Sequence, residues 1–491
     1  MRKSGVLLHI SSLDSDFGIG TLGKSAYDFI DFLKESGQSF WQVLPLGPTG
    51  YLDSPYQSFS AFAGNPYFID FDILNDWGYL NKEDYNAINW CEKEDRVDYG
   101  KIYNNKSLVL RKAFNVFKEK TDDEFYLFCN NEAYWLDDYC IFMALKNKTG
   151  LAWYDWDYEI KTRNFDALNR VKEELKDEIL FFKMQQFFFY KQWHNIKDYA
   201  NKNKIEIIGD LPIYVAYDSA DVWANKDEFL LDENLNPLML AACPPDDFTQ
   251  DGQLWGNPVY DWQHMQENGF SWWLKRIIKN KSYFDVIRLD HFRGFEKYYS
   301  VAFNSKNARN GVWKNGPGIA IFDKIKEKVP SVKMIAEDLG FITDDVKKLL
   351  KDTGFEGMKV LQFGFDANDD SDYLPHNYNK NSILYIGTHD NPTIKQYISE
   401  LNEKDFKFLK DYLRLNENEG YVMGILKSAF ASVCNTVIVQ MQDLLELGAS
   451  SRMNTPSKSE GNWCWRLYKG QINENVKERL LNLTELYRRL H

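Results

Sequence analysis

Apolar residues along the chain gather into short runs rich in β-branched and aromatic side chains, a pattern typical of buried strands. Eight such runs occur, at residues 6–10, 41–45, 205–210, 285–290, 332–338, 358–363, 382–390 and 436–441. Stretches with helical periodicity lie between many of them, such as 24–37, 341–353 and 421–433. Strands alternating with helices indicate a parallel sheet, and eight such units predict an α/β fold of the (β/α)8 TIM-barrel type.

One long interruption separates the second predicted strand from the third. Between residues 45 and 205 the stretches 107–120, 123–147 and 169–203 have helical periodicity. We expect the last of these to be the helix that packs on the barrel before the third strand. The remainder, 75–179, is predicted to be a mostly helical subdomain inserted into the barrel.

Two further features complete the predicted organisation. A loop-rich insertion at 211–284 is expected to cover one side of the site, and a closing helix is expected at 472–490. No room remains after that helix for a C-terminal β-domain. The chain, 1–491, is therefore predicted to form a single catalytic barrel.

The composition narrows the classes of ligand and the location. A net charge of −13 argues against nucleic acid, whose binding needs a basic surface. Aromatic residues make up 16% of the chain, which suits stacking against a neutral polar ligand such as a sugar. No apolar run approaches the length of a membrane span, and no secretory signal is seen. The six cysteines include no CxxC pair. We expect a cytoplasmic protein; no feature indicates its oligomeric state.

The fourth predicted strand ends in an arginine and an aspartate on one face. Residues two apart on a strand share a face, so Arg288 and Asp290 should lie side by side, with His291 in the loop beyond. The cation is expected to keep Asp290 ionised and its pKa low. This suits a nucleophile or a metal ligand, although a buried ion pair that merely holds a loop fits the stretch equally well.

Three carboxylates share this position at strand ends: Asp290, Glu337 and Asp390 follow the fourth, fifth and seventh strands. Barrel enzymes place their chemistry there. Retaining glycoside cleavage needs two carboxyl groups about 5–5.5 Å apart, and adjacent strands lie about 4.7–4.9 Å apart. Asp290 and Glu337 could therefore act as an ionised and a protonated pair, and Asp390 could stabilise positive charge on the sugar.

Other functions remain open from the residues alone. In a metal-dependent hydrolase the ligands would be His9, Asp210, His291, His389 and Asp390. The chain has no His-x-His pair on a strand, however, and Arg288 would repel a cation. A glycan-binding protein without activity would not need all three carboxylates. A simple α-glucan hydrolase could use the same site.

Several motifs resemble those of a known family. The runs Arg288-Leu-Asp-His-Phe-Arg-Gly, Ala336-Glu-Asp-Leu-Gly and Gly387-Thr-His-Asp-Asn resemble the catalytic regions of the α-amylase clan, and Gly209-Asp-Leu-Pro-Ile-Tyr resembles its third-strand region. The chain is most similar to 4-α-glucanotransferases of the amylomaltase type. That similarity rests on the runs Asp53-Ser-Pro-Tyr-Gln-Ser-Phe-Ser, Pro244-Pro-Asp-Asp-Phe, Gly252-Gln-Leu-Trp-Gly-Asn-Pro, Arg452-Met-Asn-Thr-Pro and Gly461-Asn-Trp.

The resemblance implies roles for particular residues. Asp290 would be the nucleophile, Glu337 the acid/base and Asp390 the transition-state stabiliser. The residues implied to hold the sugar are Arg288, His389, Asp210 and Tyr56. Those implied on or near the acceptor side are Asp246, Phe248, Gln253, Trp255, Ser54, His291 and Asn462. One departure from the family pattern is Asp247, where an aromatic or variable residue is expected.

The implied reaction moves a segment of α-1,4-glucan from a donor to the 4-hydroxyl of glucose or another maltodextrin, by a retaining double displacement. The resemblance implies no cofactor and no metal, and neither nucleic acid nor membrane as a partner. Hydrolysis of the same linkage by the same carboxylates is the alternative.

Overall fold

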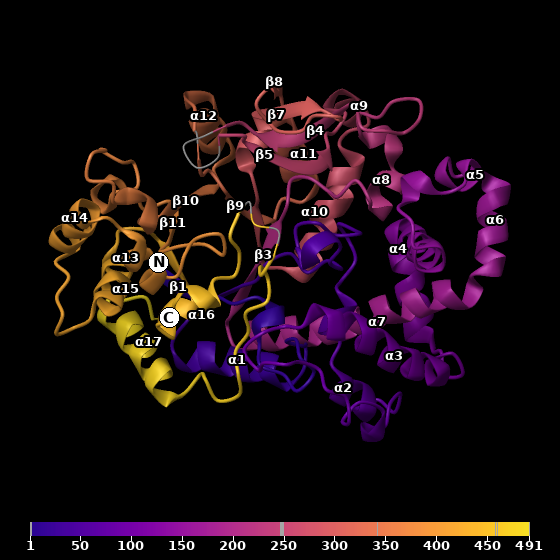
Figure 1. The fold of residues 1–491 in the computed structure, drawn as a ribbon, viewed down its shortest axis with the longest axis horizontal. Helices are drawn as coiled ribbons and strands as arrows, with labels where there is room; N and C mark the ends of the chain where they lie inside the picture. The colour runs from indigo at the N-terminus through magenta and orange to yellow at the C-terminus, as the bar shows by residue number, and fades with distance from the viewer. Residues whose placement is uncertain (1, 246–249, 341, 457, 459, 491) are drawn as a thin grey trace.

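The computed structural model describes residues 2–245, 250–340, 342–456, 458 and 460–490 (Figure 1). All eight predicted strands are present, and they pair in parallel to close a barrel in the order β1-β12-β11-β10-β9-β6-β3-β2. Their bounds are β1 (Lys3–Leu7), β2 (Phe40–Gln42), β3 (Glu206–Leu211), β6 (Val286–Leu289), β9 (Lys333–Ala336), β10 (Glu356–Val360), β11 (Ser382–Tyr385) and β12 (Thr436–Gln440). The predicted (β/α)8 fold is confirmed.

The inside of the barrel is filled by bulky apolar side chains. They are Leu7, Phe40, Ile208, Val286, Ile335, Met358, Val360, Ile383, Tyr385 and Ile438. Strands of a closed parallel barrel are buried on both faces, which is why they appear in the sequence as continuous apolar runs. Position 209 requires glycine, because an added Cβ there would lie 2.1 Å from the Phe284 ring.

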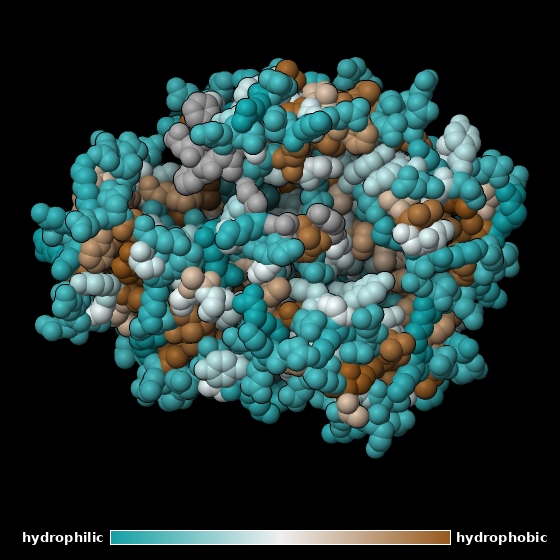
Figure 2. Space-filling view, viewed as in Figure 1, coloured by the Kyte–Doolittle hydropathy of each residue, from teal (hydrophilic) through white to brown (hydrophobic). Residues whose placement is uncertain are grey.

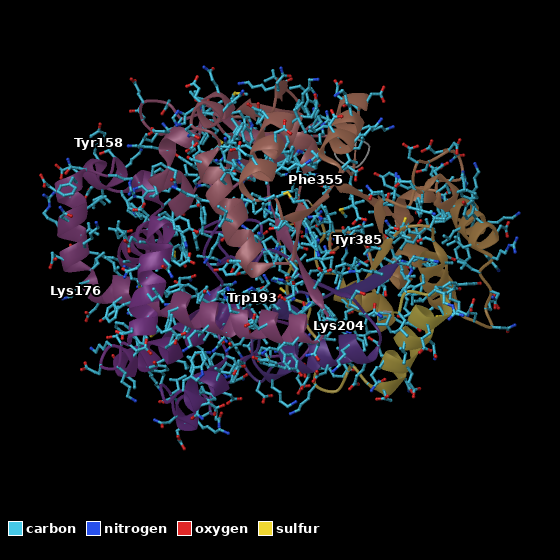
Figure 3. All side chains as sticks on the ribbon, turned by 180° about the vertical axis from the view of Figure 1, so that it is seen from behind. Tyr158, Lys176, Trp193, Lys204, Phe355 and Tyr385 are labelled. Atoms are coloured by element: carbon cyan, nitrogen blue, oxygen red, sulfur yellow. The ribbon has the colours of Figure 1, made fainter. Side chains whose placement is uncertain are left out.

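Helices cover the outside of the barrel. They include α1 (Lys24–Glu35), α7 (Lys176–Lys202), α10 (Ser271–Tyr283), α11 (Ile319–Lys328), α12 (Asp344–Thr353), α15 (Tyr421–Ala431) and α17 (Glu474–Leu486). The ends of α12 follow the usual signals: Thr343 caps its first turn, and Gly354 ends it with a left-handed φ of 74°. Seen from behind, Trp193 of α7 lies beside the barrel (Figure 3), and its indole nitrogen donates to the Tyr283 carbonyl.

Helices between β2 and β3 extend to one side of the barrel (Figure 1). They include α3 (Tyr99–Phe117) and α4 (Asp123–Thr149), near the predicted 107–120 and 123–147, together with α5 (Tyr158–Lys161) and α6 (Phe165–Glu174). The stretch expected as one helix at 169–203 is divided at Leu175, which ends α6 and precedes α7. Phenylalanine rings join the group to α7; those of Phe117 and Phe188 lie 5.4 Å apart. The bounds 75–179 for this subdomain stay a prediction.

The structure also contains a second sheet, which the pattern of apolar residues did not predict. Its antiparallel strands are ordered β5-β4-β7-β8. Their bounds are β4 (Met239–Cys243), β5 (Gln253–Pro258), β7 (Lys297–Ala302) and β8 (Val312–Asn315). The first two lie within 211–284 and the others follow β6, so this sheet joins two loops of the barrel.

The surface of the molecule is mainly hydrophilic on the face shown in Figure 2, and the hydrophobic residues visible there lie in separate patches. Within the described ranges, no helix combines the length and the apolar character needed to cross a lipid bilayer.

Candidate active site

A cleft of about 480 Å³ opens at the C-terminal ends of the barrel strands. This is within the range of about 300–1,000 Å³ that is usual for small-molecule sites. The predicted residues that line it are Ser54, Tyr56, Gln253, Trp255, Arg288, Asp290, His291, Glu337, His389, Asp390 and Asn462. The predicted residues Asp246 and Phe248, and the departure at Asp247, lie outside the described residues.

Arg288 is the charged centre of the site. Its Nη1 lies 2.7 Å from both carboxylate oxygens of Asp210 and 3.0 Å from Oδ1 of Asp290. The side-by-side arrangement of Arg288 and Asp290 predicted from the strand is therefore confirmed. A guanidinium this deeply buried needs paired carboxylates, because an unpaired charge there would be very costly.

Asp210 lies beneath the cleft and does not line it. Its side chain is fully buried, and it accepts hydrogen bonds from Arg288 and from the Tyr56 hydroxyl, at 2.8 Å for the latter. The resemblance implied that Asp210 holds the sugar. In this structure its carboxylate contacts Tyr56 and Arg288, which line the cleft, and its implied role toward the sugar stays a prediction.

The pKa of Asp290 differs from the expectation. Burial at the base of the cleft raises the pKa of Asp290 to about 7, although Arg288 opposes the shift. The expected low pKa is wrong because Arg288 is shared with Asp210, and because the negative charges of Asp210 and Asp390 add to the effect of burial. The side chain remains 27% exposed, so it is accessible to a ligand.

Glu337 follows β9 and lies beside this pair. Its Oε2 accepts the His291 amide at 2.7 Å, and its Oε1 accepts the Leu339 amide at 3.2 Å. Burial raises the pKa of Glu337 to about 8, with a smaller contribution from Asp290. A raised pKa fits the protonated member of the pair expected from the sequence, and burial is its main cause.

The charge of Asp290 disfavours ionisation of Glu337, and burial raises the pKa of both carboxyls. Arg288 contacts Asp290, whereas Glu337 accepts the backbone amides of His291 and Leu339. The guanidinium contact favours Asp290 as the ionised member, and Glu337 as the protonated one, of a retaining acid and nucleophile.

His291 follows Asp290 at the end of β6, and a hydrogen bond links its backbone to Glu337 at the end of β9. Its backbone is left-handed, with φ 51° and ψ 49°, which is uncommon for a residue other than glycine. This conformation presents its amide to Glu337. Its ring meets the Trp255 ring edge-on, with centroids 4.9 Å apart.

Asp390 is the most open of the three carboxylates, with 43% of its side chain exposed. Oδ2 lies 3.3 Å from Nε2 of His389, and Oδ1 accepts a hydrogen bond from the Asn454 amide at 2.5 Å. Burial lowers the pKa of His389, although Asp390 opposes the shift. The His389 ring stacks on Tyr56, with centroids 5.2 Å apart and planes 16° apart.

Sequence reasoning missed two residues of this group. Asn454, in the run at 452–456, was given no role at the site, yet its side-chain amide donates to Asp390. Trp463 lines the cleft, and its ring lies 5.9 Å from that of His389. Both stand in motifs that carry the family resemblance, which was the available signal.

Asn462 and Trp255 shape the rim of the cleft. Asn462 uses its amide to close its own loop, accepting from the Thr455 amide and donating to the Lys458 carbonyl, both at 2.9 Å. Trp255 is half-buried, whereas Trp262, Trp272 and Trp273 are buried. His9, one of the candidate metal ligands, is also buried, and its Nδ1 accepts the Leu44 amide. In the described part of the chain, no three His, Cys, Asp or Glu residues are grouped so as to hold a metal ion.

Comparison with known proteins gives consistent results. Residues 8–471 match the family described as 4-alpha-glucanotransferase. The chain is 48% identical to a 4-alpha-glucanotransferase of Clostridium butyricum over 98% of this chain and 100% of that one. It is 43% identical to a 4-alpha-glucanotransferase of Thermus thermophilus, over 100% and 99%.

A solved structure gives the same result. The amylomaltase from Streptococcus agalactiae in complex with acarbose superposes with a TM-score of 0.98, at 42% identity and with full coverage of both chains. That similarity extends over the barrel, the helical insertion and the small sheet alike.

Proposed function

Because the chain belongs to the 4-α-glucanotransferase family, and is an enzyme with that activity, we propose how its cleft carries out the transfer. Asp290 is the nucleophile, Glu337 the acid/base and Asp390 the stabiliser of the oxocarbenium-like transition state. The observation that carries this proposal is the closeness of the two carboxyl groups. Burial raises the pKa of Asp290, and the amide of the next residue, His291, donates to Glu337.

In the first half-reaction the Asp290 carboxylate attacks the anomeric carbon of the donor. The bond from that carbon to the glycosidic oxygen breaks as Glu337 donates its proton to the leaving oxygen. A β-glycosyl ester on Asp290 and a shortened glucan result. Glu337 is then ionised while Asp290 is esterified, so the repulsion between the two carboxylates is absent at this stage.

In the second half-reaction the 4-hydroxyl of an acceptor attacks the same anomeric carbon. Glu337 accepts the hydroxyl proton, and the ester bond to Asp290 breaks. Two inversions give net retention of the α-linkage. Both catalytic residues return to their starting protonation states.

Asp390, Tyr56 and His389 hold the sugar at the point of cleavage. The exposed Asp390 carboxylate faces the cleft and can offset positive charge on the ring as the bond breaks. Asn454 and His389 fix the direction of that carboxylate.

Transfer competes with hydrolysis, because water outnumbers a millimolar acceptor by roughly 10⁴–10⁵. Parity requires about 6 kcal/mol of stabilisation specific to the sugar acceptor, at ~1.4 kcal/mol per tenfold. The ring of Trp255 provides an apolar surface at the cleft on which a second sugar can stack and displace water. We assign Gln253, Ser54, His291 and Asn462 to the same acceptor side.

The test is incubation of the purified protein with maltotriose alone, followed by separation of the products. We expect free glucose and a ladder of longer maltodextrins, with nearly constant reducing ends because each cleaved linkage is replaced. Reducing ends that rise in step with substrate loss, without longer chains, would identify a hydrolase instead.

The wider setting is also a proposal. The Streptococcus agalactiae relative was solved with acarbose, which supports α-1,4-glucans as ligands of this cleft. No disulfide joins two of the described cysteines, which supports a reducing, cytoplasmic compartment. We propose a role in maltodextrin, starch or glycogen metabolism, with 75–179 as a separate helical subdomain and 211–284 as the insertion over the acceptor side.

A further inference from the structure

The loop between β7 and β8 lies against the turn that precedes β5. The Ala308 amide donates a hydrogen bond to the Asp251 carbonyl at 2.8 Å, and the Arg309 guanidinium lies 2.6 Å from the Asp251 carboxylate. Ala308 is fully buried, and a Cβ added to Gly252 would lie 2.8 Å from the Ala308 Cβ. Loop and turn are therefore packed directly against each other.

Tyr299, on β7, orders this loop from beneath. Its hydroxyl donates to the Ala308 carbonyl at 2.9 Å and accepts from the Gly311 amide at 2.8 Å. Its ring is buried with Leu240 and Val301. The Tyr299 hydroxyl thus bonds both to Ala308, which contacts the turn, and to Gly311, which directly precedes β8.

The strand fixed by this turn needs such support. β5 is at the edge of its sheet and pairs only with β4, and that pairing shifts register between Leu240 and Ala242. On its other side the Gln57 amide donates to the Trp255 carbonyl at 3.0 Å. Gln253 and Trp255 line the cleft. They follow Asp251, the turn residue that Ala308 contacts, by two and four positions.

We propose that Tyr299 is a positioning residue for acceptor capture: through Ala308 and Asp251 it sets the start of β5 and hence the place of Trp255. The inference rests on the proposed function, in which Trp255 meets the acceptor. A sugar acceptor can stack on the Trp255 ring only if that ring is accurately placed. Water that attacks the same intermediate needs no stacking surface. Loss of the Tyr299 hydroxyl therefore weakens transfer selectively.

The test compares Tyr299→Phe with Tyr298→Phe. Tyr298 is buried on the same strand, and in the described ranges its hydroxyl makes no hydrogen bond. The donor is α-maltosyl fluoride, with maltose as the varied acceptor, so fluoride release and the two products are measured together. For Tyr299→Phe we expect KM for maltose and the hydrolysis share to rise about three- to tenfold. Hydrolysis without acceptor should stay within about twofold of the wild-type rate, as should every value for Tyr298→Phe.

A second variant disturbs the same contact from the loop. Arg309→Ala removes the ion pair to the Asp251 carboxylate and should raise KM for maltose in the same direction. Both side chains of this pair are exposed, so the variant keeps the inference testable if Tyr299→Phe does not fold. Equal loss of transfer and hydrolysis in both variants, or an acceptor KM unchanged in both, would overturn the positioning role. A wild-type protein that makes no longer chains from maltotriose would instead refute the proposed function.

Discussion

At the scale of single residues, the chemistry depends on which of two neighbouring carboxyls keeps a proton. Burial raises both pKa values, to about 7 for Asp290 and about 8 for Glu337. Arg288 opposes both shifts, but its charge is shared with Asp210. The contact of Arg288 with Asp290, which Glu337 does not share in the described hydrogen bonds, favours Asp290 as the nucleophile and Glu337 as the acid.

Replacement of the nucleophile tests the first role. Asp290→Asn should lower transfer by about 10⁴ or more, since no covalent intermediate can form, while an amide oxygen can still accept from Arg288. The measurement is the rate of the maltotriose ladder, together with the melting temperature and the anomeric configuration of wild-type products.

A matched control is Asp443→Asn. Asp443 is also buried, with a pKa raised to about 7 by burial, but it accepts the Ile394 amide and does not line the cleft. Its variant should retain most activity. Substantial turnover by Asp290→Asn, or products of inverted configuration, would contradict the role of Asp290.

Glu337→Gln tests the acid/base role. Proton transfer by a positioned group contributes about 10²–10⁴ in rate, so activity on maltodextrins should fall by that factor. The first step on α-maltosyl fluoride should be much less affected, because fluoride leaves without a proton. Burst measurements of fluoride release separate the two, and an equal loss on both donors would argue against the assignment.

The pH profile follows from the same two groups. Activity requires Asp290 ionised and Glu337 protonated, so kcat/KM on maltodextrins should fall below about pH 7 and above about pH 8. The basic limb should disappear for the fluoride donor in wild-type protein.

At the scale of elements, β6 and β9 carry the proposed catalytic pair, and the edge strand β5 carries the proposed acceptor surface. The parallel pairing of Leu289 with Ala336 places Asp290 and Glu337 at neighbouring strand ends. β5 belongs to the small sheet, so the proposal puts acceptor selection and bond cleavage on different sheets.

Trp255→Ala tests that division. We expect the hydrolysis share to rise about tenfold, because an indole that can stack on the acceptor is lost while the barrel residues remain. Tyr158→Ala, on α5 and 77% exposed, is the control, because Tyr158 does not line the cleft. The readout is the ratio of free maltose to transfer product from α-maltosyl fluoride. An unchanged ratio in Trp255→Ala would contradict the assignment of Trp255 to the acceptor surface.

At the scale of the whole molecule, ionisation of the partly buried carboxyl groups of the site lowers the free energy of unfolding at neutral and alkaline pH. A carboxyl whose folded pKa is raised favours folding of the protonated form; its ionisation destabilises the fold from about pH 4.5, the unfolded value, up to about pH 8. Glu337→Gln removes this ionisation. The stability of the variant relative to wild type should therefore grow by about 1–3 kcal/mol between pH 4.5 and 8, allowing for partial exposure to the cleft. Denaturant unfolding at both pH values measures it, and a constant difference would contradict the raised pKa.

The sequence by itself determined the barrel and the positions of its chemistry. Runs of apolar residues appear as strands because a closed parallel barrel buries both strand faces, and a carboxylate after such a run must lie at the open end. Period-two geometry was sufficient to place Arg288 beside Asp290. Local patterns of this kind require no knowledge of distant residues.

Only the tertiary structure decided the rest. The small sheet forms from segments on either side of β6, none of which carries a strong strand signal alone. The contact of Asn454 with Asp390 joins residues 64 positions apart, and that of Asp210 with Arg288 joins residues 78 positions apart. The raised pKa of Asp290 likewise depends on burial by distant parts of the chain. Burial is a property of the assembled cleft, and its effect on the pKa of Asp290 exceeds that of the one cation that the sequence places beside it.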